Sequence, residues 1–409
     1  MASRPMEGVR VVEVAQYTFV PAAGAILAEW GAEVIKVEHA EKGDAQRGLV
    51  SLGAVSAGGP FAPIMEHPNH NKRSIGIALE VPKGLEILHR LVRDADVFVT
   101  NFLPGARSRL HIEVEDMRKV NPRIIYVRGT ALGVRGEDRA RPGFDGISYW
   151  YRGGSAFGGT PPNLEGIAPM PAPAYGDSIG GMTIAGGISA ALFARERTGE
   201  PSIVDVSLLG VGAWANALAI EMSFLNGQPW QPAPMGKYQS VPTNPLVGVF
   251  PTEDGRWIGL SMLQPGRFWQ DFCRHLGRED LITDPRFDTI DKVVSNAVEA
   301  GAIIASEFKS RPYAEWVERF RTLEGPWEPV QDSVELGQDP QLLANGLIGD
   351  VTDVEGRTQR LVAAPVQFDE CAAVLERAPQ FAEHTDEILR ELGITDSELI
   401  ELKVAGAVT

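Results

Sequence analysis

The sequence is poor in the residues that build disulfide frameworks and metal sites. Its 409 residues include two cysteines and seven histidines. Cys273 and Cys371 lie far apart and the histidines are scattered, so neither a disulfide framework nor a metal site is predicted. We therefore expect a protein of the reducing cytoplasm that holds no metal.

Positive charge and long apolar runs are also scarce. Lysine and arginine total 38 against 54 aspartates and glutamates, a formal net charge of -16 at pH 7. Nucleic-acid binding needs clustered cations, so no nucleic-acid partner is predicted. The longest weakly polar run, residues 180–194, is too short to span a bilayer, and residues 1–10 lack the apolar core of a signal peptide. No membrane partner is expected.

The first forty residues show a strand, helix and strand pattern. Residues 9–15 and 33–37 are short β-branched runs, and residues 21–30 predict a helix that begins with proline and stops at Gly31. Such a unit suggests a dinucleotide fold, with Glu38 in the place of a ribose-binding acid. The first turn, however, lacks the G-x-G-x-x-G run that a pyrophosphate needs. Nicotinamide binding is therefore not favoured.

Alternating strands and helices continue to about residue 224. Residues 43–68, rich in glycine and proline, are expected to form a long ordered loop. A turn over residues 101–105 follows a predicted strand, at the edge where open α/β sheets place ligands. The further elements predicted here are a helix over 82–95 and strands over 96–100, 124–128 and 203–206.

The pattern changes after about residue 225. Two strands around Glu253-Asp254-Gly255 predict a hairpin, and helical patterns follow over 268–276, 292–308 and 313–321. Residues 349–364 predict another strand pair, and the last thirty residues predict surface helices. We therefore expect a large α/β domain over 1–224, a small α+β domain over 225–326, and a return to the large domain over 327–409.

The segment from Ala174 to Gly199 combines an acidic residue with a glycine-rich apolar helix. Asp177 occupies the expected N-cap, where its carboxylate would face the orphan amides and the positive end of the helix dipole. Gly180 and Gly181 would let another backbone or a ligand come close. From the residues alone, two interpretations stay open: a structural N-cap, and a nucleophile whose oxyanion is received by nearby glycine amides.

The chain resembles the class III coenzyme A transferases in four ordered segments: EGVRVVEVAQYTFVPAAGAILAEWGAEVIKVEHAEKGD, HNKRSIGIAL, VFVTNFLPGARSRL and YGDSIGGMTIAGGISAALFARERTG. This group includes formyl-CoA transferase, carnitine CoA-transferase and α-methylacyl-CoA racemase. The resemblance is strong over residues 6–210 and looser over 327–365. It implies a Rossmann-like large domain built from both chain ends, an inserted smaller α+β domain, and an interlocked homodimer.

By this resemblance Asp177 matches the family's catalytic aspartate. The implied activity is acyl-CoA:carboxylate CoA transfer through an aspartyl anhydride and an aspartyl-CoA thioester. Acyl-CoA and a carboxylate are then the substrates, with no permanently bound cofactor. A carboxylate suits this role because we expect it to be ionised at pH 7.

The resemblance also implies a CoA site, residue by residue. Asn101, Phe102 and Arg109 match positions that contact CoA, and Lys72 and Arg73 would supply cations for its phosphates. For Lys72 and Arg73 the residues themselves equally allow a solvated strand entrance. The remaining implied residues are His39, where some relatives have an arginine, and Gln16 and Tyr17, which either face the thioester or pack in a turn.

Two departures from the family narrow the expected reaction. Racemases of the group use a histidine before an aspartate, whereas this chain has Phe144 before Asp145, and phenylalanine carries no proton. A 2-methylacyl-CoA racemase is therefore an alternative of second rank, and a non-catalytic CoA-ester-binding protein is a third. The small-domain glycine run of formyl-CoA transferase is missing, so substrates larger or more apolar than formate are expected. Asp145 is either a pocket acid or a helix N-cap, and Gly180 and Gly181 are possible pocket residues.

Overall fold

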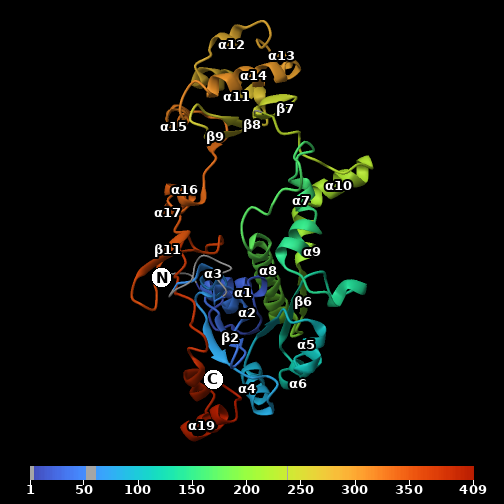
Figure 1. Cartoon of the computed structure of the whole chain (residues 1–409), viewed down its shortest axis with the longest axis vertical. Coiled ribbons are helices and arrows are strands. Elements are labelled where there is room, and N and C mark those ends of the chain that lie inside the picture. Colours follow the sequence, from blue (N-terminus) through green and yellow to red (C-terminus); the bar gives the residue numbers. More distant parts are fainter. Residues whose placement is uncertain (1–3, 52–60, 237) are drawn as a thin grey trace. The chain divides into compact units, whose positions relative to one another are not determined.

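The computed structural model describes residues 4–51, 61–236 and 238–409. The chain forms two compact units, whose course is drawn in Figure 1. The first unit contains the N-terminal part through Phe157, Ala168–Trp230 and Asp339–Thr409. The second contains Gly158–Ile167 and Gln231–Gln338.

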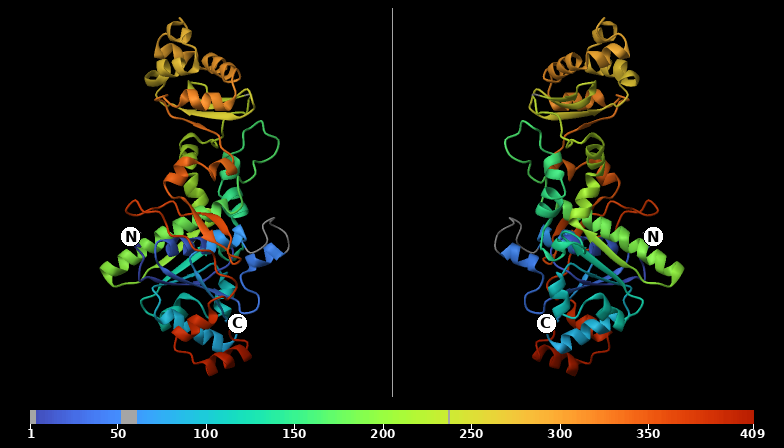
Figure 2. Two further views of the ribbon diagram at one scale, coloured as in Figure 1. Left: turned by 90° about the vertical axis from the view of Figure 1, so that its left-hand side faces the viewer. Right: turned by 90° about the vertical axis from the view of Figure 1, so that its right-hand side faces the viewer.

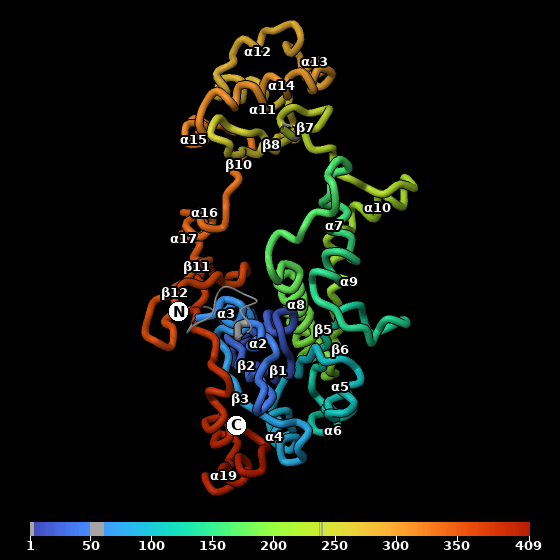
Figure 3. The backbone as a smooth tube through the Cα atoms, viewed as in Figure 1, coloured from blue at the N-terminus to red at the C-terminus, as the bar shows by residue number. Residues whose placement is uncertain are grey.

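A six-stranded parallel sheet forms the centre of the first unit (Figures 1 and 3). Its order is β3-β2-β1-β4-β5-β6, in which β1 pairs with both β2 and β4. This is the strand order of the Rossmann fold, so the predicted α/β, Rossmann-like character is confirmed. The strands are β1 (Arg10–Val14), β2 (Glu33–Glu38), β3 (Arg73–Gly76), β4 (Val97–Thr100), β5 (Ile125–Thr130) and β6 (Ile203–Ser207).

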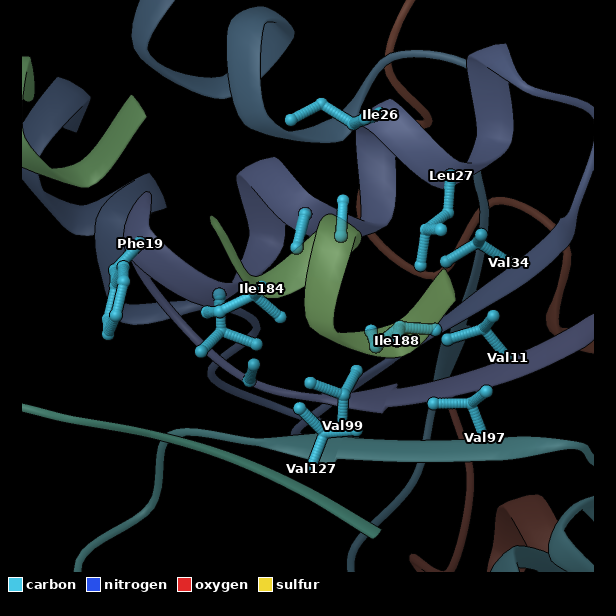
Figure 4. Close-up of a cluster of buried hydrophobic side chains, with 14 of the residues drawn as sticks. Val11, Phe19, Ile26, Leu27, Val34, Val97, Val99, Val127, Ile184 and Ile188 are labelled. Atoms are coloured by element: carbon cyan, nitrogen blue, oxygen red, sulfur yellow. The ribbon is translucent and has the colours of Figure 1, made fainter. Parts of the chain in front are cut away.

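Helices α1 (Phe19–Glu29) and α8 (Tyr175–Thr198) cover one face of this sheet. Figure 4 shows Ile184 and Ile188 of α8 in the same cluster of buried side chains as Val99 and Val127 of the strands. The buried residues of α8 recur every three or four positions from Gly176 to Arg195, which is the spacing of one helix face. Asp177 lies on that buried stripe.

Both ends of the chain contribute to the first unit. On the second face of the sheet, α4 (Pro82–Arg93) and α6 (Val114–Val120) share a buried cluster with the C-terminal helices α18 (Thr385–Glu391) and α19 (Asp396–Val404). Figure 2 shows the C-terminal helices beside α4. A parallel sheet buried on both faces explains why its strands read as near-continuous apolar runs.

Helix α8 is long and apolar enough to cross a membrane by length and composition alone. The bent pair α9 (Leu208–Ala215) and α10 (Ala217–Asn226) passes the same test if it is taken as one span. In the structure, α8 packs with ten of its residues buried against α1 and the sheet. It is therefore a core helix of the first unit.

The second unit contains a four-stranded antiparallel sheet, β10-β9-β8-β7, with helices on it. The predicted hairpin is confirmed, because β8 pairs with β9 and Pro251 lies opposite Trp257. The predicted helix over 292–308 is wrong in one respect: it is split at Asn296, whose side chain donates to the Arg286 carbonyl at 2.9 Å. The elements are β7 (Gln239–Val241), β8 (Asn244–Pro251), β9 (Trp257–Ser261), β10 (Trp327–Pro329), α11 (Pro265–Leu276), α12 (Asp280–Thr283), α13 (Ile290–Ser295), α14 (Ala297–Phe308), α15 (Tyr313–Phe320) and α16 (Ser333–Leu336).

The structure also tests the loop predicted over residues 43–68 and the strand pair predicted over residues 349–364. The long loop predicted over residues 43–68 is wrong, since it contains α2 (Ala45–Ser51) and α3 (Pro63–Asn69); residues 52–60 lie outside the described chain. The strand pair expected over 349–364 is confirmed as the hairpin of β11 and β12. The remaining elements are α5 (Pro104–Arg109), η1 (Glu137–Ala140), η2 (Gly146–Tyr151), α7 (Ser155–Gly158), α17 (Pro340–Ala344), β11 (Ile348–Thr352) and β12 (Thr358–Val362).

Candidate active site

A cavity of about 390 Å³ lies at the carboxyl edge of the parallel sheet. Its walls come from the segments that follow β1, β4 and β5, together with Asp177 from α8. The chain order of the sheet reverses between β1 and β4, and open α/β sheets bind ligands at that point. The cavity therefore occupies the edge at which the sequence predicted a ligand.

Asp177 reaches this cavity from the first turn of α8, not from its N-cap. The helix begins at Tyr175, after Ala174 in the left-handed conformation (φ 57°), so Asp177 is the third helical residue. The predicted N-cap is therefore wrong. Glycine at residue 176 in this turn lets Tyr149 pack closely on the helix, since a Cβ there would lie 2.5 Å from the Tyr149 ring.

The Asp177 carboxyl group is buried and short of partners. It is 7% exposed, and its Oδ1 atom has no hydrogen-bond partner within the described part of the chain. Burial raises the pKa of Asp177 to about 8, and the nearby charge of Asp145 adds to that rise. The expectation of an ionised carboxylate at pH 7 is thus corrected, because burial and the charge of Asp145 both favour the neutral acid.

Asp145 takes the second of the two roles that the sequence left open, that of a helix N-cap, and it lines neither cavity described here. Its Oδ1 accepts a hydrogen bond from the Gly146 amide at 2.7 Å, as the N-cap of η2. Its Oδ2 is buried without a partner among the residues described. Asp145 therefore caps a helix and also places a second carboxylate close enough to Asp177 to affect its ionisation.

Gly180 and Gly181 serve helix packing. A Cβ on Gly180 would lie 2.3 Å from the Phe19 ring, and one on Gly181 would lie 2.6 Å from the Cβ of Ala22. Both residues lie beyond the first turn of α8, so their backbone N–H groups donate to carbonyls within the helix. Their expected role as oxyanion donors is therefore replaced by close contact between α8 and α1.

Asn101 fixes the turn that follows β1. Its Oδ1 accepts from the Gln16 N–H at 3.1 Å, and its Nδ2 donates to the Gln16 carbonyl at 2.6 Å. The next residue, Tyr17, has φ 66°, and its N–H donates to Asp44 Oδ1 at 3.1 Å. Asp44 is itself paired with the buried Lys36 at 2.8 Å. A tyrosine in the left-handed region is costly, so these contacts hold a strained turn.

The strained turn places the Tyr17 ring against Phe144, a residue to which the sequence analysis gave no role in the site. The rings of Tyr17 and Phe144 meet edge to face, with centroids 5.1 Å apart, and both residues line the cavity. Phe144 is 53% exposed. In the sequence, Phe144 was notable only because it cannot carry a proton. Its contact with Tyr17 could not be predicted, because the two residues come from segments far apart in the chain.

A second cavity of about 400 Å³ adjoins the first and shares Gln16, Phe102 and Ala106 with it. It lies over the carboxyl ends of β1, β2 and β3, and its wall contains His39 and Arg109, two residues of the implied CoA site. Lys42, which sequence reasoning missed, lines it too. Its position in the tight turn after His39 was the signal that could have found it.

His39 uses both ring nitrogens within the protein. Nδ1 lies 3.2 Å and 3.3 Å from the backbone amides of Glu41 and Lys42, which can only donate. Nε2 therefore carries the proton and donates to Glu80 Oε1 at 2.8 Å. In this arrangement His39 shapes the turn that bears Lys42.

Lys72 and Arg73 lie outside both cavities, which corrects their expected role as phosphate ligands. The Lys72 ammonium group is fully buried, 2.7 Å from Glu13 Oε2, and donates to the carbonyls of Pro21 and Pro68. Burial lowers its pKa to about 8. Arg73 pairs with three glutamates: Glu33, Glu387 and Glu391. Because each of these cations is already paired with carboxylates of the protein, we assign both of them a role in stabilising the fold.

Three arginines in the wall of the first cavity were not singled out as site residues. Arg107 is buried and donates to the Phe102 carbonyl at 2.7 Å and to Glu113 at 3.1 Å, so it supports the loop after β4. Arg139 and Arg141 are exposed on the segment before Phe144. No group of three or more potential metal ligands occurs among the residues that the structure describes.

The fold and the site together define an α/β protein with a buried carboxyl group at the switch point of a Rossmann-type sheet. The chain belongs to CoA-transferase family III, whose family profile matches residues 6–385. The resemblance inferred from the four sequence segments is therefore confirmed.

Curated relatives match along almost the whole chain. The chain is 30% identical over 404 residues to (R)-2-hydroxy-4-methylpentanoate CoA-transferase of Clostridioides difficile, covering 97% of this chain and 98% of that one. It is also 30% identical over 402 residues to cinnamoyl-CoA:phenyllactate CoA-transferase of Clostridium sporogenes, covering 97% and 95%. A crystal structure of a CAIB/BAIF family protein from Brucella suis superimposes with a TM-score of 0.79 at 26% identity, covering 95% of this chain and 100% of that one.

Proposed function

We propose that the protein moves CoA from an acyl-CoA to a free carboxylate through covalent intermediates on Asp177. The observation that carries this proposal is the state of that side chain. Asp177 is a buried carboxyl group with an unpartnered oxygen in the described chain, and it lines the cavity at the switch point.

The electrostatics of the site favour acylation. An ionised Asp177 is costly because it is desolvated and lies near Asp145. Attack on a thioester converts the carboxylate to a neutral anhydride, which removes both penalties at once. With a pKa of about 8, roughly a tenth of the molecules carry the ionised form at pH 7.

The proposed reaction has four balanced steps. An Asp177 oxygen attacks the thioester carbonyl, the C–S bond breaks, and CoA leaves as its thiolate. The thiolate attacks the aspartyl carbonyl and expels the donor acid, leaving an aspartyl-CoA thioester. The acceptor carboxylate then attacks this thioester, giving a second anhydride and the thiolate again. Attack of the thiolate on the acceptor's acyl carbon releases the new acyl-CoA and restores Asp177.

The two adjoining cavities suit an extended ligand. We place the thioester in the cavity that holds Asp177, and the phosphates of CoA in the second cavity near Lys42 and Arg109. These local cations would balance phosphate charge on a protein of net charge -16. Phe102 lies in the wall of both cavities and would contact the connecting part of CoA.

Substrates larger or more apolar than formate remain part of the proposal. Two of the relatives are named for 2-hydroxy-4-methylpentanoate and for cinnamoyl-CoA with phenyllactate. The two alternatives gain no support: position 144 carries no proton for a racemase, and a pure binder has no use for a buried unpartnered carboxyl group.

A test is intact-protein mass spectrometry after brief incubation with a panel of acyl-CoAs and an acid quench, with a parallel hydroxylamine treatment. Wild type should show a hydroxylamine-sensitive CoA adduct that Asp177→Asn lacks. Asp291→Asn, on the surface of the second unit, serves as the matched control. A protein that binds CoA but forms no adduct with any donor would refute the covalent route.

Family membership also leads us to propose a homodimer, an inserted small domain and a cytoplasmic location. Helix α10 supports the dimer, since each of its residues is at least partly exposed. Phe224 and Leu225 are 81% and 85% exposed, and Trp214 of α9 is 83% exposed. Large apolar side chains gathered in this way are typical of a surface that another chain covers. Light scattering after size exclusion should give twice the chain mass of 44.3 kDa.

A further inference from the structure

We propose that Tyr17 and Phe144 form the subsite for the acyl chain, and that this subsite selects apolar chains over charged and short ones. The inference rests on the proposed function, because it assigns the acyl group of the anhydride to a wall of the Asp177 cavity. It applies to donor and acceptor alike, since each acyl group is attached to Asp177 in turn.

The position of Phe144 supports this assignment. Phe144 and Asp177 line the same cavity, and Phe144 is adjacent in the chain to Asp145, whose charge acts on Asp177. An acyl group bound to Asp177 must extend into this cavity. The exposed ring of Phe144 is one of the surfaces of this cavity that it can contact.

The chemistry of the wall favours an apolar chain. An aromatic ring that is half exposed gains stability when an apolar ligand covers it. The edge-to-face contact with Tyr17 makes the two rings one continuous surface, and Phe19 and Leu208 line the same cavity. The cavity of about 390 Å³ lies within the usual range of small-molecule sites, about 300–1,000 Å³, and exceeds the needs of a one-carbon acid.

The subsite is preorganised. The Tyr17 ring depends on a strained backbone that Asp44 and Asn101 hold from two sides. Strain retained in this way fixes the ring before the substrate arrives, which lowers the entropy cost of binding. A turn built only for folding would not need its tyrosine in the left-handed region.

The competing assignment comes from Arg139 and Arg141 in the same wall, which could bind a chain that ends in a carboxylate. Arg141 already shares Asp138 with Arg152, at 3.2 Å and 2.7 Å from that carboxylate. Arg139 and Arg141 are both exposed, so solvent would weaken an ion pair between either of them and a substrate carboxylate. We therefore favour the aromatic rings as the selecting surface.

The test uses two donors of one shape. Glutaryl-CoA and 5-methylhexanoyl-CoA share a five-carbon skeleton, with two carboxylate oxygens in one replaced by two methyl groups in the other; acetyl-CoA serves as the short reference. In wild type, kcat/KM should be at least tenfold higher for 5-methylhexanoyl-CoA than for either other donor. In Phe144→Ala this preference over acetyl-CoA should fall about tenfold or more, and Phe144→Leu should restore most of it. Phe193→Ala, which truncates an exposed ring of α8 outside both cavities, should keep the wild-type preference.

The outcomes separate this proposal from the proposed function. Transfer with acetyl-CoA together with an unchanged preference in both Phe144 variants would refute the subsite while the transferase stands. A preference for glutaryl-CoA would assign selection to the arginines and also refute it. Absence of transfer and of adduct with every donor would refute the proposed function itself. If Phe144→Ala does not fold, Phe144→Gln keeps a side chain of intermediate size without its apolar ring and should lose the preference in the same way; a preference that Phe144→Gln retains would then refute the subsite.

Discussion

The side-chain amide of Asn101 binds both backbone groups of Gln16, across 85 positions of sequence. Asn101 follows β4 and Gln16 follows β1, so the pair of hydrogen bonds bridges the two strands at which the chain order of the sheet reverses. These two hydrogen bonds hold the backbone that leads into Tyr17 in place. Asn101 thus acts on the cavity through another residue, as a positioning residue.

Replacement of Asn101 should therefore affect turnover more than binding. In Asn101→Ala we expect kcat to fall about 10–100-fold, because the Gln16-Tyr17 turn loses its support and small displacements at a reacting centre are costly. The KM for acyl-CoA should change less. Steady-state kinetics check this prediction, with Asn101→Asp as a stricter variant that keeps the acceptor and loses the donor. A rise in KM at constant kcat would instead indicate direct contact with CoA.

Burial of Asp177 should set the pH profile, and the charge of Asp145 should shift it further. Burial and Asp145 raise the pKa of Asp177 to about 8, and the ionised form attacks, so kcat/KM should rise with pH up to about that value. Asp145→Asn removes the like charge and should move the acidic limb to lower pH. The measurement is kcat/KM between pH 5.5 and 9. An unmoved limb would contradict the contribution of the Asp145 charge to the pKa of Asp177.

Asp177 should destabilise the protein at neutral and alkaline pH. Its folded-state pKa of about 8 exceeds the unfolded value near 3.9, so between these values the folded state binds more protons. Stability therefore falls as pH rises through this window. Asp177→Asn removes the titration, so its melting temperature should exceed that of wild type by a few degrees at pH 8 and by little at pH 5. A constant difference across this range would contradict the raised pKa.

Two glycines of α8 should respond oppositely to alanine. In Gly181→Ala the new Cβ would lie 2.6 Å from Ala22 Cβ, so overpacking should cost about 1–3 kcal/mol of unfolding free energy. Gly186 is exposed, and a Cβ there would meet open space in the described structure. Gly186→Ala should stabilise the helix by about 0.5–1 kcal/mol. Denaturant unfolding measures both, and equal effects would contradict the close contact of α8 with α1.

Lys72 and Arg109 should separate stability from CoA binding. Lys72→Met leaves Glu13 short of a buried partner, and breaking a buried pair costs about 3–5 kcal/mol. Arg109 lies on the surface of the second cavity, so Arg109→Gln should leave stability within about 0.5 kcal/mol while raising the KM for acyl-CoA several-fold. Unfolding curves and kinetics of the two variants test this. A folded, stable Lys72→Met with weakened CoA binding would restore the phosphate role.

Much of the fold follows from local sequence pattern. The β-branched runs, the proline and glycine that bound α1, and the turn over 253–255 each encode an element within a few residues. Their alternation predicted an α/β domain and the family resemblance implied a Rossmann-like one, and the parallel sheet confirms both. The four segments around the strand ends sufficed to assign the family, which the match over residues 6–385 confirms. Asp177 was prominent because it is the acid at the head of a glycine-rich apolar helix.

Only the tertiary structure decided what these residues do. Lys72 is buried and paired with Glu13, and Gly180 and Gly181 pack against α1. Asp145 lies close enough to raise the pKa of Asp177, and the ring of Phe144 contacts that of Tyr17. Each of these effects depends on a partner far away in the chain. Desolvation and charge coupling are properties of three-dimensional surroundings, whereas periodicity is a property of neighbours in sequence, so the sequence could name the residues without fixing their electrostatic state.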